Sequence, residues 1–324
     1  MSIDMNTLAV VLEQPEQLAV RRLDLTPPSP ADCVVDIHWS GISTGTERLL
    51  WSGRMPPFPG LAYPLVPGYE SVGQILAAGE DSGRVVGEQV FVPGARCYGE
   101  VAGLFGGAAS RVIAPGNRLL PLPTDLGEQG VLMALAATAH HAIAPEVAAS
   151  HAPSGQTPDL IIGHGVLGRL LARLAVAMGG APVVWERNPE RVAGAEGYQV
   201  IAPESDERRD YRRICDVSGD SKLLDVLIAR LAPGGEIIIA GFYEAPLAFD
   251  FPPAFMRELR LRVAAEFKEP DLIAVKSLIE SGRLSFDGLI THRLPAEQAA
   301  EAYVTAFSDP SCLKMILDWR HVDV

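Results

Sequence analysis

The sequence predicts an α/β protein in which an antiparallel β-barrel is followed by a doubly wound parallel sheet. Up to about residue 120, short apolar runs recur about every ten residues with Gly and Pro between them, which favours an antiparallel barrel or sandwich. Beyond that point, short apolar strands alternate with helical stretches, which favours a parallel sheet covered by helices. The runs of the first part are LAVVLE, CVVDIHW, SVGQILAAG, EQVFVPG and SRVIAPG.

Helices and strands alternate from about residue 130 onward. ALAATAHHAIAPEVAA is Ala-rich and helical, and VLGRLLARLAVAMGG is an amphipathic helix with arginines on one face. Past Phe267 the chain becomes mainly helical, apart from a short apolar segment at CLKMILDW. The strands expected between the helices are DLIIG, APVVWE, ICDVSG, GEIIIAGF and LRLRVAAEF.

Composition narrows the class of protein. The net charge of −13 over 324 residues argues against a nucleic-acid partner, because neutralising phosphates requires clustered Lys and Arg. The cysteines are scattered without a C-x-x-C pair, which favours a reducing compartment. The N-terminus lacks the features of a signal peptide, and no apolar run reaches the ~18 residues of a membrane span. We therefore expect a cytoplasmic protein without an integral membrane segment.

A glycine-rich loop in IIGHGVLGRLL predicts a dinucleotide site. Its glycines follow a strand and open a helix, so the helix N-terminus faces the phosphates of a bound dinucleotide. Glu186 ends the next strand 23 residues after Gly163 and can accept hydrogen bonds from ribose hydroxyls, which favours NAD over NADP. Arg187 could instead accommodate a 2′-phosphate, which leaves NADP open. The expected cofactor contacts are Gly163, Gly165, Val166, Leu167, Gly168, Glu186 and Arg187.

The chain as a whole resembles the medium-chain dehydrogenase/reductase family. GISTGTE (41–47) lies where that family has its first zinc-ligand loop, and PGYESVG (67–73) lies at its Gly-His-Glu segment. The resemblance implies a GroES-like β-barrel catalytic domain (1–125), a Rossmann domain (126–267), a return segment of the catalytic domain (268–324), and a homodimer. It also implies cofactor contacts for Thr138 and Gly241, with Lys314 near the pyrophosphate. The other matching segments are LAATAHHA (135–142), LITHRLP (289–295) and CLKMILDW (312–319).

The positions at which the family carries its catalytic zinc ligands hold other residues in this sequence. They hold Ser43, Tyr69 and Ala134, which are poor ligands for zinc. The lobe that normally carries four close structural cysteines retains only Cys97. The sequence therefore predicts no metal.

A narrower resemblance is to dehydrogenases of bacteriochlorophyll synthesis within that family. It implies NAD-dependent oxidation of the 3-(1-hydroxyethyl) group of a bacteriochlorophyllide-type macrocycle to 3-acetyl. The segments that carry it are SGISTGTERLLWSGRMPPFPG, YPLVPGYESVG, LFGGAASR, GHGVLGRLLARL, RRDYR, CDVSGD and AGFY.

Without a metal, a side chain must take the hydroxyl proton. Tyr69 is the leading candidate, although it could merely fill the space left by the zinc. A phenol also needs a suitable neighbour to act as a base near neutral pH, and Glu70 would oppose this. Glu47 and Glu70 are expected to anchor their loops. The alternative proton acceptors are Thr46, Ser43, Thr44, His140 and His141.

The segment LLWSGRMPPFPGLAYPLVPG is expected to line an apolar cleft for a large flat substrate. Arg48 and Arg54 could pair with the substrate's propionate, and ordinary loop packing is the alternative for the aromatic residues. The candidate lining residues are Trp51, Met55, Phe58 and Tyr63.

Two other functions are compatible with the residues. One is a zinc-free enone or quinone reductase that uses NADPH, which Glu186 disfavours. The other is a non-catalytic dinucleotide-binding protein that kept the fold. Cofactor preference separates the first alternative from the alcohol oxidation, and turnover of a hydroxyethyl substrate separates the second.

Overall fold

The computed structural model describes residues 4–57, 59–144 and 157–322. The chain forms two compact units, and each is described by itself. Unit 1 comprises Met1–Ala134 and Phe286–Val324, and unit 2 comprises Leu135–Ser285. This division places the helix Glu269–Glu280 in unit 2, whereas the sequence placed residues 268–324 in the return segment. The helix contributes Asp271, which hydrogen-bonds His140 and His141 of unit 2.

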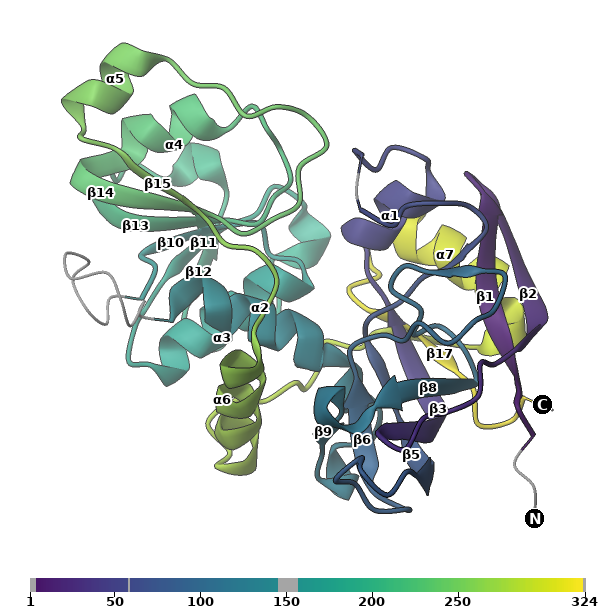
Figure 1. The fold of residues 1–324 in the computed structure, drawn as a ribbon. Coiled ribbons are helices and arrows are strands. Elements are labelled where there is room, and N and C mark those ends of the chain that lie inside the picture. Colours follow the sequence, from purple (N-terminus) through teal and green to yellow (C-terminus); the bar gives the residue numbers. More distant parts are fainter. Residues whose placement is uncertain (1–3, 58, 145–156, 323–324) are drawn as a thin grey trace. The chain divides into compact units, whose positions relative to one another are not determined.

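Among the described residues, the strands of unit 1 form a seven-stranded and a four-stranded sheet (Figure 1). The larger has the order β16-β17-β3-β5-β6-β9, with β8 also paired to β3, and the smaller has the order β2-β1-β4-β7. The strands are β1 (Asn6–Gln14), β2 (Gln17–Asp24), β3 (Asp32–Ile42), β4 (Leu65–Val66), β5 (Ser71–Ala78), β6 (Gln89–Val92), β7 (Ala102–Gly103), β8 (Arg111–Pro115), β9 (Leu120–Pro121), β16 (His292–Pro295) and β17 (Met315–Asp318). The helices are α1 (Thr46–Trp51) and α7 (Ala299–Ser308).

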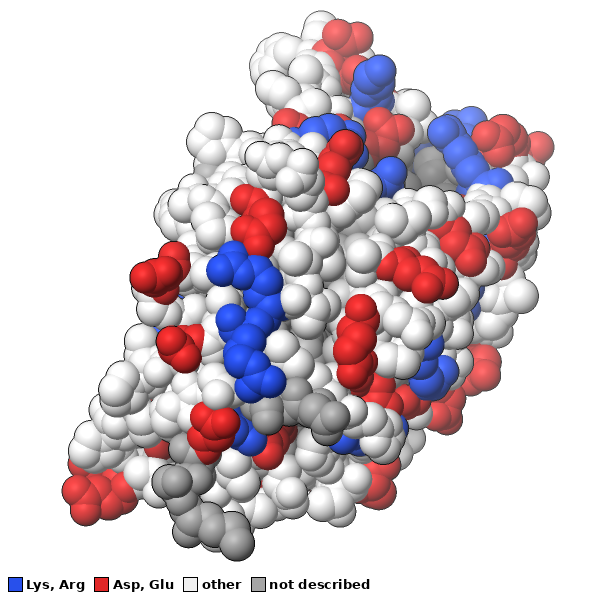
Figure 2. All heavy atoms as spheres, turned by 90° about the vertical axis from the view of Figure 1, so that its right-hand side faces the viewer, with Lys and Arg blue, Asp and Glu red and all other residues white. Residues whose placement is uncertain are grey.

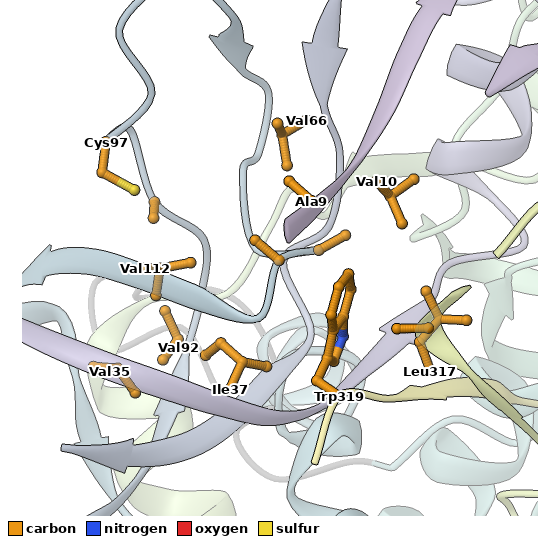
Figure 3. Close-up of a cluster of buried hydrophobic side chains, with 14 of the residues drawn as sticks. Ala9, Val10, Val35, Ile37, Val66, Val92, Cys97, Val112, Leu317 and Trp319 are labelled. Carbon is orange, nitrogen blue, oxygen red and sulfur yellow. The ribbon is translucent and has the colours of Figure 1, made fainter. Parts of the chain in front are cut away.

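All five runs that the sequence predicted as strands in the first part are strands. β2 was not predicted, because most of its side chains are exposed or half-buried and its residues show no clear alternation. The core of unit 1 is formed by side chains of β1, β2, β3, β4, β5, β6, β8 and β17, of α7 and of the segments between them, and Figure 3 shows a part of it. Its labelled side chains are Ala9, Val10, Val35, Ile37, Val66, Val92, Cys97, Val112, Leu317 and Trp319.

Unit 2 contains a six-stranded parallel sheet in the order β12-β11-β10-β13-β14-β15. Renumbered from β10, this is the 3-2-1-4-5-6 order of a doubly wound dinucleotide-binding sheet, which confirms the predicted fold class. Figure 1 shows α3 on one side of the strands and α4 and α5 on the other. The elements are α2 (Met133–Ile143), β10 (Leu160–Ile162), α3 (Val166–Ala177), β11 (Val183–Trp185), β12 (Gln199–Ile201), β13 (Tyr211–Asp216), α4 (Leu224–Arg230), β14 (Leu231–Ile239), α5 (Phe251–Met256), β15 (Arg260–Val263) and α6 (Glu269–Glu280).

The predicted strands of unit 2 and both predicted helices are present, and the end of the Ala-rich helical stretch, from residue 145, lies outside the described residues. None of the described helices is long and apolar enough to cross a bilayer.

Figure 2 shows one face of the molecule, where a run of Lys and Arg side chains is bordered by Asp and Glu. Charges of both signs are therefore mixed on this face.

Candidate active site

The glycine loop of unit 2 has the backbone that a phosphate cradle needs. β10 ends at Ile162, and Gly163 follows with φ +100°, a conformation that L side chains rarely adopt. Gly165 caps the N-terminus of α3, and a Cβ there would meet no atom within 4 Å. A Cβ on Gly168 would lie 1.8 Å from the carbonyl oxygen of Gly163, so only glycine lets the helix approach the loop this closely. The loop therefore presents open space at the helix N-terminus.

Glu186 lies beside this loop and is held by backbone amides. One carboxylate oxygen accepts from the His164 amide at 3.0 Å, and the other accepts from the Asn188 amide at 2.8 Å. Each oxygen keeps further acceptor capacity, so the carboxylate is oriented and remains able to bind a ribose hydroxyl. Arg187 points outward, with its side chain 67% exposed and 3.9 Å from Glu204. These residues lie beside the loop at which a dinucleotide is expected to bind.

His164 is a part of the loop that sequence reasoning missed. It is fully buried, with Nδ1 2.6 Å from the Arg191 carbonyl and Nε2 2.8 Å from the Tyr198 hydroxyl. Because a carbonyl only accepts, Nδ1 carries the proton, and burial lowers the pKa of His164 to about 4. Arg169 of α3 donates to the same carbonyl at 2.9 Å. A neutral histidine and a buried arginine thus tie residues 191–198 to the loop.

The other expected cofactor residues of unit 2 lie in separate elements. Thr138 is half-buried in α2, and Gly241 follows β14, close to Val217 and Gly219. Val166 and Leu167 form the first turn of α3, with Val166 buried and Leu167 half-buried. The roles of these four residues in binding a cofactor stay predictions.

In unit 1, three of the four predicted catalytic residues meet around one phenol. The Tyr69 hydroxyl lies 2.6 Å from Ser43 Oγ and 3.5 Å from Thr46 Oγ1, while Thr44 is exposed. The Tyr69 ring packs edge-on against Phe105, with ring centroids 5.1 Å apart. Burial raises the pKa of Tyr69 well above its usual value, and the Glu70 carboxylate adds to this. Tyr69 is therefore a neutral phenol at physiological pH and is not a phenolate base.

Two carboxylates are fully buried behind this cluster. Glu47 accepts from the Ser43 amide at 3.1 Å and from the Tyr303 hydroxyl at 2.5 Å. Burial raises the pKa of Glu47 to about 7, with Glu70 adding to the rise. Glu47 therefore anchors the loop after β3 to α7, as the sequence suggested. Tyr303 was missed because no sequence signal points from α7 to this loop.

Lys314 lies in a place that the sequence did not anticipate. It is 1% exposed, and its amine is 2.6 Å from Glu70 Oε2 and 3.1 Å from the Ile42 carbonyl. Burial raises the pKa of Glu70, and the lysine opposes that rise. The other oxygen of Glu70, Oε1, has no hydrogen-bond partner among the described residues. The expectation of Lys314 beside a cofactor pyrophosphate would require its amine to leave this ion pair.

The residues at the family's zinc-ligand positions do not fit a zinc ion. Ser43 and Tyr69 hydrogen-bond to each other, and Ala134 has no donor atom. Across residues 4–57, 59–144 and 157–322, no three His, Cys, Asp or Glu side chains are grouped so that they could hold a metal. His140 and His141 both bind one carboxylate, that of Asp271, at 2.7 Å and 2.9 Å.

The predicted substrate residues separate into two sets. Arg48, Trp51 and Arg54 line one cavity on the surface of unit 1. The Tyr63 hydroxyl instead donates to the Leu50 carbonyl, and its ring packs on a small core cluster that includes buried Met55. Phe58 lies outside the described residues.

The sequence and the fold of the chain are similar to those of known dehydrogenases. The alcohol dehydrogenase GroES-like domain family matches residues 29–124. The chain is 56% identical to the 2-desacetyl-2-hydroxyethyl bacteriochlorophyllide A dehydrogenase of Cereibacter sphaeroides, over 98% of this chain and 99% of that protein. It is 55% identical to the protein of the same name in Rhodobacter capsulatus, over the same shares. A short chain alcohol dehydrogenase of Escherichia coli CFT073, solved with NADH, has a TM-score of 0.80 at 21% identity and covers 97% of this chain and 99% of its own.

Proposed function

The chain belongs to the medium-chain dehydrogenase/reductase family with an alcohol dehydrogenase GroES-like domain, and from this premise we propose that it oxidises a hydroxyethyl bacteriochlorophyllide. The reaction converts the 3-(1-hydroxyethyl) group of the macrocycle to 3-acetyl, and the alcohol loses a hydride and a proton. The observation that carries the proposal is the 56% identity to a dehydrogenase of this substrate along 98% of the chain.

NAD is the proposed cofactor, and when bound it supplies the acceptor for the hydride. Glu186 supports NAD because a fixed carboxylate accepts hydrogen bonds from a ribose diol and repels a 2′-phosphate. Arg187, the residue that could favour NADP, is mostly exposed and lies 3.9 Å from Glu204. The open space at Gly165 suits a pyrophosphate at the N-terminus of α3.

The proposed role of Tyr69 is that of a neutral hydrogen-bonding group, since its raised pKa opposes a phenolate. Its oxygen accepts a hydrogen bond from the substrate hydroxyl while its own proton points to Ser43 Oγ, 2.6 Å away. The Tyr69 oxygen takes the substrate proton as the Tyr69 proton passes to Ser43 Oγ, and the proton of Ser43 passes to solvent water, so that both hydroxyls end neutral; Thr46, 3.5 Å from Tyr69, is a second route. Charge that develops at the carbinol carbon spreads into the conjugated macrocycle, which lessens the need for a Lewis acid.

We propose that the oxidation proceeds without zinc, because serine, tyrosine and alanine stand at the family's ligand positions. The test is to treat the purified protein with a strong chelator and then add NAD and 3-hydroxyethyl bacteriochlorophyllide a. Formation of NADH and the shift of the macrocycle's long-wavelength absorption band are followed together. An undiminished rate supports zinc-free oxidation, whereas activity only after zinc is restored overturns it. No turnover in either metal state overturns the substrate and favours an enone reductase or a non-catalytic binder.

We also propose a homodimer built on the edge of the unit 2 sheet. β15 is the last strand in the sheet order, so one of its edges is unpaired within the described sheet. Val263 of this strand is 70% exposed, and Phe251 and Phe255 of α5 are 68% and 66% exposed. An apolar surface next to an open strand edge suits pairing with a second copy.

A further inference from the structure

A cavity of about 290 Å³ lies on the surface of unit 1, between the end of α1, the helix α7 and the turn that joins β1 to β2. α1 supplies Arg48 and Trp51, and Arg54 follows shortly after that helix. α7 supplies Val304 and Phe307, and the turn supplies Glu16. Because the three segments come from distant parts of the chain, the fold assembles this cavity and no local motif encodes it.

The wall of the cavity is fixed by specific contacts. The Glu16 amide donates to the Trp51 carbonyl at 2.6 Å, which ties the turn to the end of α1. Glu16 has φ +63°, a left-handed backbone that a non-glycine residue adopts at a cost. The Trp51 ring packs against Phe307, with centroids 5.6 Å apart. The aromatic side of the cavity is therefore formed before any ligand arrives.

The polar side of the cavity carries an excess of positive charge. Arg48 and Arg54 contribute two guanidinium groups, and Glu16 contributes one carboxylate. Both arginines are exposed, so their heads can turn toward a ligand, and Arg54 Nε already donates to Ser52 Oγ at 3.1 Å. Guanidinium forks bind carboxylates in a bidentate manner, and the neighbouring indole and phenyl rings suit an apolar carrier.

The size and position of the cavity indicate which part of a ligand it takes. Its volume is at the lower limit of the roughly 300–1,000 Å³ of sites that enclose whole ligands, so it suits one arm of a larger molecule. α1 begins at Thr46, one of the hydroxyls around Tyr69, and Arg48 and Trp51 follow within two turns of helix. A macrocycle whose alcohol lies at Tyr69 can thus extend a side chain along α1.

We propose that this cavity binds the propionate side chain of the substrate, with Arg48 and Arg54 binding its carboxylate and Trp51 and Phe307 packing on its hydrocarbon part. The proposal rests on the proposed function. It makes the two arginines specificity-determining residues for substrates with a free acid. Glu16 lines the same cavity, so its negative charge opposes the binding of a second carboxylate there and limits the affinity.

The test compares 3-hydroxyethyl bacteriochlorophyllide a with its propionate methyl ester, which keeps the reacting group and loses the negative charge. For the protein as isolated, the acid is expected to have the lower KM. Arg48→Gln and Arg54→Gln are expected to raise KM for the acid roughly tenfold or more, and to leave KM for the ester and both kcat values nearly unchanged. Equal KM values for acid and ester in the unaltered protein, or equal losses for both in the variants, would overturn the proposal.

Two further variants sharpen the comparison. Glu16→Gln removes the negative charge of the cavity lining and is expected to lower KM for the acid alone. Arg22→Gln is the matched control, because Arg22 is exposed on β2 and its guanidinium donates to Asn6. If Arg22→Gln raises KM for the acid as much as Arg48→Gln does, the effect comes from net charge and the proposed subsite is wrong.

Failure of the proposed function is distinguishable from failure of the subsite. If the unaltered protein turns over neither compound, the function is wrong, and the dissociation constants of acid and ester are then measured by absorbance titration. Weaker binding of the acid alone in Arg48→Gln would still support a carboxylate subsite. Identical binding of both compounds by all variants would overturn the subsite as well.

Discussion

At the scale of the residue, Tyr69 combines a hydroxyl in contact with Ser43 and a ring packed on Phe105. Tyr69→Phe removes the first contact and keeps the second, so it separates proton handling from the filling of space. We expect kcat to fall by about 10²- to 10⁴-fold, the usual loss for a positioned proton-transfer group, with the melting temperature little changed. Steady-state kinetics and a thermal melt on the same preparation measure both quantities.

Ser43→Ala serves as the companion variant for Tyr69. This variant keeps the Tyr69 phenol but removes its hydrogen-bond partner at 2.6 Å. The loss of kcat is expected to be smaller than in Tyr69→Phe if Thr46 replaces Ser43 as the partner of the phenol. A Tyr69→Phe enzyme with unaltered kcat would show that the ring only fills the space at the family's ligand position.

Glu47 makes the stability of unit 1 depend on pH. Its pKa of about 7 in the folded protein lies above the ~4.3 of an unfolded glutamate, so the folded state binds more protons between these values. The contribution of this group is therefore fully present below about pH 4.3 and is lost as the pH rises through about 7. Glu47→Gln mimics the protonated form and keeps this contribution to stability as the pH rises.

We expect Glu47→Gln to gain stability relative to the unaltered protein as the pH rises, by on the order of 2 kcal/mol between about pH 5 and about pH 8. Urea midpoints of both proteins at the two pH values measure this difference, in which the shared titration of Glu70 largely cancels. The assignment of the raised pKa to Glu47 is wrong if the two proteins differ equally at both pH values.

At the scale of the element, the glycines of the turn from β10 to α3 have different roles. Gly168→Ala places a Cβ 1.8 Å from the Gly163 carbonyl oxygen, so α3 must move. We expect a loss of roughly 1–3 kcal/mol in stability together with weaker binding of NADH. Gly165→Ala meets no protein atom within 4 Å and has φ −72°, so stability is expected to fall by at most about 1 kcal/mol.

Gly165→Ala still fills the space that the pyrophosphate is proposed to occupy, so its NADH affinity is expected to fall at least as much as that of Gly168→Ala. Fluorescence titration with NADH and thermal melts of the two variants measure the pair. Normal NADH binding by Gly165→Ala would show that the phosphates lie elsewhere.

Ten of the strands and the helices α2 and α3 could be predicted from the sequence because their signals are local, whereas the short strands β4, β7, β9 and β12 were not predicted. The strand, glycine loop and helix at residues 160–177 follow one another without interruption, and each residue type is explained by its neighbours. β2 was missed since an exposed strand has little apolar patterning. His164 was missed for another reason: its partners, Arg191 and Tyr198, are 27 and 34 residues away, and no motif connects them.

At the scale of the whole molecule, the parts that escaped prediction join distant segments of unit 1. Lys314 is 244 residues from Glu70, and Tyr303 is 256 residues from Glu47, yet both pairs are buried and hydrogen-bonded. The family resemblance placed the C-terminal segment with the first domain but could not state which side chains meet. These two contacts connect the returning chain to the loops that carry Ser43 and Tyr69, so the C-terminal segment helps to position the proposed catalytic hydroxyls.

The proposed homodimer interface lies on unit 2, at the edge of β15 and on α5. If the edge of β15 and the apolar side chains of α5 form a two-fold interface, the protein in solution has about twice the 34.6 kDa of one chain. Val263→Lys introduces a charge that two-fold symmetry brings close to its own copy, so we expect a monomer by size-exclusion chromatography with light scattering. Val85→Lys is the matched control, because Val85 is 66% exposed on unit 1 and is expected to leave the dimer intact. A monomeric unaltered protein, or a dimer that survives Val263→Lys, would rule out this interface.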